Sequence, residues 1–180
     1  MKKFVVIFIP IIITFFLYGC NINNTNTNEY KEEESISVYE YTRLGNLLIK
    51  FPDNWIKEDL GNNQYKLDNF TNLSISEADS ENYSLYEYVM NSINTENSNY
   101  KICSTTVLET YITKINYKES IIVEHKILNY DNNKILFYKQ CVVKSGNTAY
   151  IISLISSKNQ GISDNNKEFM KCIDSIDFYY

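Results

Sequence analysis

Hydrophobic and polar residues alternate along most of the chain after residue 46, and this period of two is typical of half-buried β-strands. Turn sequences separate several of the alternating runs, as at Gly61-Asn62-Asn63 and Asp131-Asn132-Asn133. Residues Ser35–Arg43 fit either a further short strand or a helical turn. The strands predicted by the pattern are Leu47–Phe51, Gln64–Phe70, Leu73–Ser76, Lys101–Leu108, Tyr111–Ile115, Ser120–Tyr130, Ile135–Lys144 and Thr148–Ser157.

The clearest hairpin joins Ile135–Lys144 to Thr148–Ser157 through the turn Ser145-Gly146-Asn147. Within the second of these strands, Tyr150–Ile155 is apolar on both faces. A strand of this kind needs cover on both sides, so we expect it to lie in the middle of a sheet.

One stretch in the first half of the domain has the period of an amphipathic helix. Ser84-Leu85-Tyr86-Glu87 has the spacing of a capping box, in which a Ser caps the helix and a Glu three residues later reaches back. Leu85, Val89 and Ile93 then fall on one face. The pattern predicts a helix that ends near Ile93, with Asn94–Asn99 as a loop.

A second helix is predicted near the end of the chain, with Asp164 as its N-cap. Its inward-facing residues are Phe169, Cys172, Ile173 and Ile176. Together with the long hairpins, the helices predict an α+β domain, in which helices pack on the faces of a largely antiparallel sheet. The length suits one domain with a single core.

The first twenty residues show neither the alternation of a half-buried strand nor the period of an amphipathic helix. Met1-Lys2-Lys3 is basic, Phe4–Leu17 is almost wholly apolar, and the chain becomes polar at Asn21. A charged start, an apolar run and a small residue at its end are the layout of a secretory signal. The apolar run is shorter than the roughly 20 residues that a membrane-spanning helix needs.

Leu17-Tyr18-Gly19-Cys20 resembles the lipobox of bacterial lipoproteins, although a residue smaller than Tyr18 is usual at that position. The resemblance implies cleavage before Cys20 and attachment of diacylglyceryl and palmitate-type chains to this residue. It divides the chain into a lipoprotein signal peptide (1–19), an acylated cysteine with a flexible linker (20–35) and the folded domain (36–180). The alternatives are an ordinary cleaved signal and an uncleaved anchor helix.

Composition narrows the possible partners. The net charge of −5 becomes more negative when Lys2 and Lys3 leave with the signal. An acidic domain argues against nucleic-acid binding and against a polybasic contact with anionic lipid. Asn, Ile, Lys and Tyr have AT-rich codons, and their heavy use is typical of a low-GC Gram-positive genome. The sixteen Tyr residues therefore do not by themselves indicate a binding surface.

Three cysteines follow Cys20, namely Cys103, Cys141 and Cys172. In an exported protein two of them can form a disulfide, with Cys141 as one partner, or all three can be small buried residues. No CxxC or Cys/His spacing indicates a metal site, and no cofactor motif occurs. His125 can act with Cys103 or Cys141 in a small envelope enzyme of the thiol or hydrolase type, whereas a His on a strand is more often half-exposed and inert.

The turn Pro52-Asp53-Asn54-Trp55 is the candidate ligand-facing edge, formed by Pro52, Asp53, Asn54 and Trp55. Asp53 and Asn54 can cap the turn through Asx hydrogen bonds or, less commonly, bind a cation. Trp55 either stacks on a ligand or, more commonly after such a turn, closes one end of the core.

A loose group of acidic residues lacks the spacing of a Ca²⁺ loop, and we interpret it as a solvated face. Its members are Glu77, Asp79, Glu81 and Glu87.

Three local patterns follow one another in the domain. They are Leu48-Ile49-Lys50-Phe51-Pro52-Asp53-Asn54-Trp55, Ser84-Leu85-Tyr86-Glu87-Tyr88, and Gly146-Asn147-Thr148-Ala149-Tyr150-Ile151-Ile152 with a closing helix and Asp174-Ser175-Ile176-Asp177-Phe178. In this order they resemble the PsbP/Mog1/DcrB-like family, although Ile176 and Asp177 interrupt the usual Ser-Phe ending. The resemblance covers Leu44–Tyr180. It implies an α/β/α sandwich and a non-enzymatic accessory or binding role, without naming a ligand.

The sequence therefore predicts a lipoprotein held through Cys20 at the extracytoplasmic face of the cell membrane. Its domain is expected to bind a protein partner at the envelope without catalysis, cofactor or metal. The alternative is the small envelope enzyme that uses Cys103 or Cys141 with His125.

Overall fold

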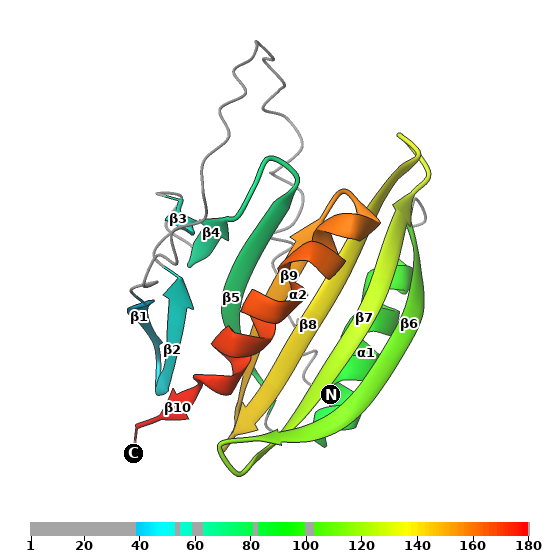
Figure 1. Ribbon diagram of the computed structural model, residues 1–180. Helices are drawn as coiled ribbons and strands as arrows, with labels where there is room; N and C mark the ends of the chain where they lie inside the picture. The colour runs from blue at the N-terminus through cyan, green and yellow to red at the C-terminus, as the bar shows by residue number, and fades with distance from the viewer. Residues whose placement is uncertain (1–38, 53–54, 59–62, 81–82, 100–102, 180) are drawn as a thin grey trace, which may run out of the picture. The chain divides into compact units, whose positions relative to one another are not determined.

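The computed structural model describes residues 39–52, 55–58, 63–80, 83–99 and 103–179, which belong to one unit of the chain (Figure 1). The predicted signal peptide, Cys20, the linker and two residues of the predicted edge, Asp53 and Asn54, lie outside the described residues. The predicted α+β class is confirmed, because two antiparallel sheets and two helices make up this part of the chain.

A three-stranded sheet joins the first and last strands of the described chain. β1 (Tyr39–Leu44) and β2 (Leu47–Pro52) form a hairpin, and β10 (Asp177–Phe178) pairs with the other edge of β2. The described part of the segment that fitted a strand or a helical turn, which begins at Tyr39, is thus a strand. Gly45 in its turn has a φ of +55°, and a Cβ there would lie 2.6 Å from a carboxylate oxygen of Glu77, so this turn requires glycine.

The second sheet has seven strands in the order β3-β4-β5-β9-β8-β7-β6. These strands are β3 (Ile56–Lys57), β4 (Gln64–Lys66), β5 (Thr71–Asp79), β6 (Cys103–Ile115), β7 (Lys118–Asn129), β8 (Lys134–Ser145) and β9 (Thr148–Ser156). The prediction that β9 is central is confirmed. The run predicted as two strands is the single strand β6, because a β-bulge between Val107 and Glu109 shifts its alternation.

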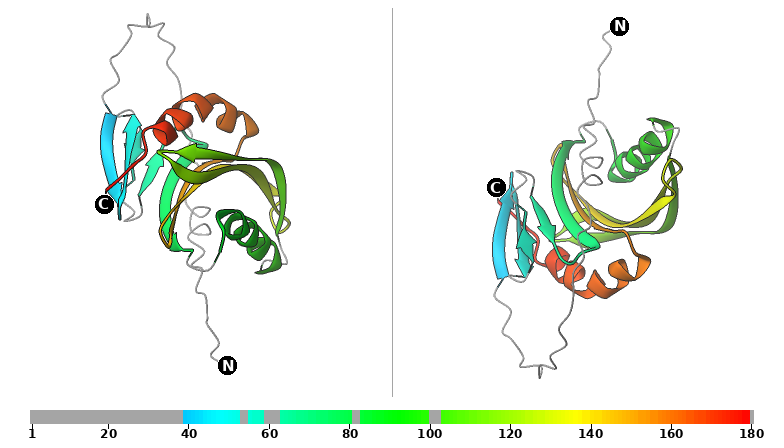
Figure 2. Two further views of the ribbon diagram at one scale, coloured as in Figure 1. Left: turned by 90° about the horizontal axis from the view of Figure 1, so that it is seen from below. Right: turned by 90° about the horizontal axis from the view of Figure 1, so that it is seen from above.

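One helix packs on each face of the large sheet. Figure 2 shows the sheet curving around α1 (Leu85–Asn99), with α2 (Asn159–Asp174) on the outer side. Successive residues of a strand point to opposite faces, so Ile121 and Val123 pack under α1 and Ile122 packs under α2. The inward-facing side chains of β2 join the core under α2. Of the helices described, neither has the length and apolarity needed to cross a membrane.

The start of α1 is as predicted and its end is not. The Ser84 backbone N–H donates to Glu87 Oε2 at 2.9 Å, and the Glu87 N–H donates to Ser84 Oγ at 3.3 Å, which are the two bonds of a capping box. The helix then continues through the predicted loop to Asn99. The apolar period stops at Ile93, but each added helical residue still gains a backbone hydrogen bond, so a polar last turn is favoured.

The predicted N-cap of α2, Asp164, is wrong. The helix begins at Asn159, and its N-cap residue is Lys158, whose side chain makes no capping bond. Gly161 explains the error, because the sequence reads it as a break. In the fold, a Cβ on Gly161 would lie 2.2 Å from Ser156 Oγ, so glycine lets the first turn of α2 approach β9 closely. The predicted inward-facing residues are buried, as expected.

Candidate functional site

The predicted ligand-facing edge is largely inside the protein where it is described. Pro52 is buried, and the side chain of Trp55 is only 7% exposed. The ring centroid of Trp55 lies 6.0 Å from that of Phe51, which in turn lies 4.3 Å from that of Tyr65. This burial favours the interpretation that the indole closes one end of the core. Because Asp53 and Asn54 lie outside the described residues, a ligand-facing edge here stays a prediction.

The nucleophile–base pair considered from the sequence is not assembled. Cys141 pairs with Ile122 across β7 and β8 and points toward α2. His125 pairs with Tyr138 and points toward α1, so the thiol of Cys141 and the imidazole lie on opposite faces of the sheet. Burial also raises the pKa of the Cys141 thiol to about 12, which removes the reactive thiolate at neutral pH.

Neither of the other two thiols can serve as a nucleophile beside His125 in place of Cys141. Cys103 lies opposite Asn129, which is four residues from His125 and therefore about 13 Å away along β7. Cys172 lies on the buried side of α2 and is fully buried, and burial raises the pKa of its thiol to about 12. All three described cysteines are thiols, and no disulfide joins them. The enzyme alternative that uses Cys103 or Cys141 with His125 is therefore not supported by the geometry.

His125 is a core residue. It is 1% exposed, and its ring stacks on Tyr138 with centroids 4.8 Å apart and an interplanar angle of 5°. Burial lowers the pKa of His125 to about 4, so the ring is neutral at pH 7. Its Nδ1 atom is buried without a hydrogen-bond partner. The expectation of a half-exposed histidine is thus wrong, because the side chain is enclosed in the layer between the sheet and α1.

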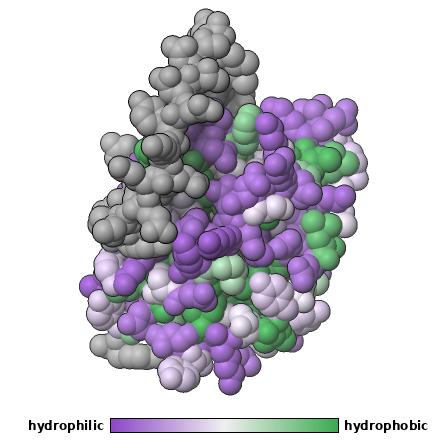
Figure 3. Space-filling view, viewed as in Figure 1, coloured by the Kyte–Doolittle hydropathy of each residue, from purple (hydrophilic) through white to green (hydrophobic). Residues whose placement is uncertain are grey.

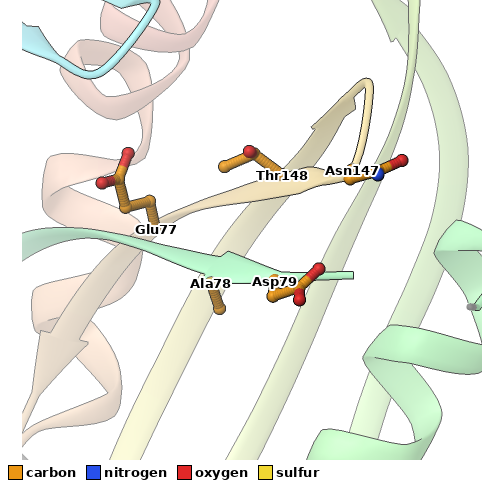
Figure 4. Close-up of a pocket in the computed structure, with 5 residues that line it drawn as sticks. All are labelled: Glu77, Ala78, Asp79, Asn147 and Thr148. Carbon is orange, nitrogen blue, oxygen red and sulfur yellow. The ribbon is translucent and has the colours of Figure 1, made fainter. Parts of the chain in front are cut away.

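Of the predicted acidic group, Glu81 lies outside the described residues, and the other three do not form a cation site. Glu77 and Asp79 line an open hollow of about 510 Å³ with Ala78, Asn147 and Thr148, and their carboxylates do not converge on one point (Figure 4). Glu87 is used in the α1 cap. No group of three or more potential metal ligands occurs among the described residues. The solvated face predicted from the sequence is the better interpretation.

Sequence reasoning missed a surface that the small sheet creates. We call it the outer face of the small sheet, and its residues are Tyr41, Arg43, Leu48, Lys50, Asp177 and Tyr179. These side chains point away from the core because the alternate positions of β2, such as Leu47 and Ile49, are fully buried. With Ser175, most of them line a hollow of about 480 Å³.

Two cation–π contacts arrange this outer face. Lys50 Nζ lies 4.7 Å from the ring centroid of Tyr41, which is 53% exposed. Arg43 Cζ lies 5.6 Å from the ring centroid of Tyr179, which is 52% exposed. Tyr and Arg are enriched at protein interfaces because they bury a large area and still hydrogen-bond. The arrangement can therefore bind an anionic or polar group between aromatic walls.

A second exposed apolar group lies along β6, the edge strand of the large sheet, where Val107, Leu108, Tyr111 and Ile112 are exposed. The space-filling view shows apolar patches among polar residues on the side where β6 and β7 run (Figure 3).

No protein-family model matches the sequence, and no curated protein is similar enough to count as a relative. Solved structures do match the fold. Cyanobacterial PsbP from Synechocystis sp. PCC 6803 matches with a TM-score of 0.60 at 13% identity, over 84% of this chain and 98% of that chain. The Saccharomyces cerevisiae Ran-binding protein Mog1p matches with a TM-score of 0.56 at 8% identity, over 79% and 96%. A Pseudomonas aeruginosa protein of unknown function matches with a TM-score of 0.54 at 15% identity, over 76% and 94%. The domain therefore has the PsbP/Mog1-like fold that the sequence resemblance implied.

Proposed function

We propose that this chain is a lipid-anchored protein of the bacterial cell envelope whose folded domain binds a protein partner and performs no catalysis. One observation carries the binding role: the domain exposes a pre-arranged surface of Tyr and cationic side chains, while its His and two of its thiols are buried. A fold neighbour, Mog1p, is a Ran-binding protein, so this fold is compatible with protein recognition. The similarity itself concerns the fold alone.

The anchor rests on the N-terminal sequence. The charged start, the apolar run and Leu17-Tyr18-Gly19-Cys20 together support lipidation of Cys20. Each buried CH₂ of an acyl chain contributes about 0.8 kcal/mol to membrane binding, so two or more chains hold a protein stably where one does not. The acidic chain then stays clear of anionic lipid, and the linker allows the domain to search for a partner near the membrane.

Metabolic labelling tests the anchor. Cells expressing the wild-type chain or Cys20→Ala are grown with an alkyne-tagged fatty acid and then separated into membrane and medium fractions. We expect the label and the membrane location with wild type only. An unlabelled wild type that is released to the medium as fully as the variant would contradict the anchor.

Site-specific photo-crosslinking tests the binding role in the same cells. A photoreactive residue replaces Tyr41 on the outer face of the small sheet or, as a control, Tyr130, which has the same exposed fraction of 53% but lies at the turn after β7. We expect a discrete crosslinked protein from position 41 that position 130 does not give. Equal background at both positions would count against a binding role for this surface.

A further inference from the structure

We propose that the outer face of the small sheet binds a segment rich in Asp and Glu on its protein partner. This inference rests on the proposed function, since it names the class of ligand for a domain that we take to be a binding module. It is argued from the two cations, the two aromatic walls and the hollow between them.

The platform under these side chains is rigid. Tyr41 pairs with Lys50, and Arg43 pairs with Leu48, across the β1–β2 ladder. The backbone N–H of Lys50 also donates to Ser175 Oγ at 2.9 Å, which ties β2 to the end of α2. The binding groups are therefore held on strands instead of on a loop, which lowers the entropy lost on binding.

The two cations lack an acidic partner within the described chain. Neither Arg43 nor Lys50 forms an ion pair with a carboxylate there. The one carboxylate on the face, that of Asp177, is already engaged through Oδ1. This atom accepts hydrogen bonds from Asn116 Nδ2 at 2.6 Å and from the Phe178 backbone N–H at 2.8 Å. An otherwise acidic chain thus presents a local cationic surface, which is complementary to a carboxylate-rich ligand.

The donors suit carboxylates in an extended segment. Arg43 uses its Nε to donate to the Gly45 carbonyl at 3.1 Å, which orients the terminal NH₂ groups of the guanidinium for a bidentate contact. Lys50 supplies a point charge inside the hollow of about 480 Å³. Tyr41 and Tyr179 offer exposed ring faces and hydroxyl groups to the peptide backbone. A hollow of this size holds a few side chains, not a whole folded domain.

An anionic membrane surface would use the same charges, but the face fits it less well. Membrane attachment by charge needs a cluster of four or more Lys and Arg residues, and this surface has two, together with the carboxylate of Asp177. A concave site with aromatic walls favours a peptide. Vesicle binding is therefore an outcome of the test that would overturn the inference.

The test uses the full-length chain in detergent micelles and a fluorescein-labelled oligoglutamate peptide, with oligoglutamine of the same length as the neutral probe. We expect anisotropy to report saturable oligoglutamate binding that weakens with added salt and is absent with oligoglutamine. Arg43→Glu/Lys50→Glu should reduce the affinity about tenfold or more and should bind oligolysine instead. Lys167→Glu, an exposed charge reversal on α2, is the matched control and should bind as wild type does.

Arg43→Gln/Lys50→Gln keeps the experiment informative if the charge reversal perturbs folding, because it removes charge without adding any. Circular dichroism verifies the fold of each variant. No binding of oligoglutamate by wild type, equal loss with Lys167→Glu, or binding only to phosphatidylglycerol vesicles would each overturn the inference. None of these results affects fatty-acid labelling or crosslinking from position 41. A failure of this inference can therefore be told apart from a failure of the proposed function.

Discussion

The two faces of the large sheet are built differently. Under α2, twenty described residues from both sheets and the helix form one buried apolar cluster, and Phe169, Cys172 and Ile173 are fully enclosed. Under α1 the corresponding cluster has eight described residues. Polar groups lie beside it, including the stacked His125 and Tyr138 and the hydrogen bond from Gln140 Nε2 to Ser153 Oγ at 3.0 Å. We infer that the packing under α2 contributes most of the free energy of unfolding. The groups under α1 make that free energy depend on pH.

The largest predicted effect is a difference between the two helices in the stability lost when the same Ile→Ala substitution is made on each. Ile173→Ala on α2 is expected to lower the free energy of unfolding by about 4 kcal/mol, and Ile93→Ala on α1 by about 2 kcal/mol, within the roughly 2–5 kcal/mol range for Ile→Ala in cores. Ile173 is enclosed by two sheets and its helix, so a cavity there cannot collapse easily. Urea denaturation of both variants measures the difference. Equal losses would remove the contrast between the faces.

The next largest effect is the pH dependence of the free energy of unfolding that arises from His125. The folded pKa of about 4 lies below the unfolded value of about 6.5, so the unfolded state binds more protons between these values. Stability is therefore fully present above pH 6.5 and falls as the pH falls toward 4. The loss attributable to His125 should be about 2 kcal/mol between pH 7 and pH 5.

The variant His125→Phe isolates this term, because it keeps a ring against Tyr138 and removes the only His in the chain. Unfolding free energies at pH 7 and pH 5 are compared for wild type and variant, since the carboxylates contribute alike to both. If the two proteins lose the same stability, the imidazole is not buried as a neutral group.

The helices and strands on the two faces also show which features the sequence could predict. Strand positions, the central place of β9 and the capping box at Ser84 were predictable because each depends on a short run of residues. The end of α1 at Asn99 and the start of α2 at Asn159 were not. Those boundaries depend on backbone hydrogen bonding in polar residues and on the close approach of Gly161 to Ser156, which alternation does not encode.

The candidate site was harder to predict than the fold. The outer face of the small sheet joins Tyr41 and Lys50 to Tyr179, and only the pairing of β10 with β2 brings them together. For Trp55 the sequence favoured closure of the core over stacking on a ligand, and the rings of Phe51 and Tyr65 beside it support that choice. Local sequence patterns therefore predict single helices and strands. A surface formed by residues from both ends of the domain can be predicted only when the pairing of the strands is known.

The smallest effect concerns the helix starts on the two faces. Ser84→Ala removes a cap that α1 has, and it should lower the free energy of unfolding by about 1 kcal/mol. Ser163→Ala, at an exposed position near the start of α2, where no side chain caps the helix, should change it by less than about 0.5 kcal/mol. A second readout is specific to the cap: hydrogen bonds from Ser84 hold the pKa of Glu87 below its usual value, and Ser84→Ala should let this pKa rise. A destabilised Ser84→Ala protein whose Glu87 titrates as in wild type would show that the loss comes from somewhere other than the capping box.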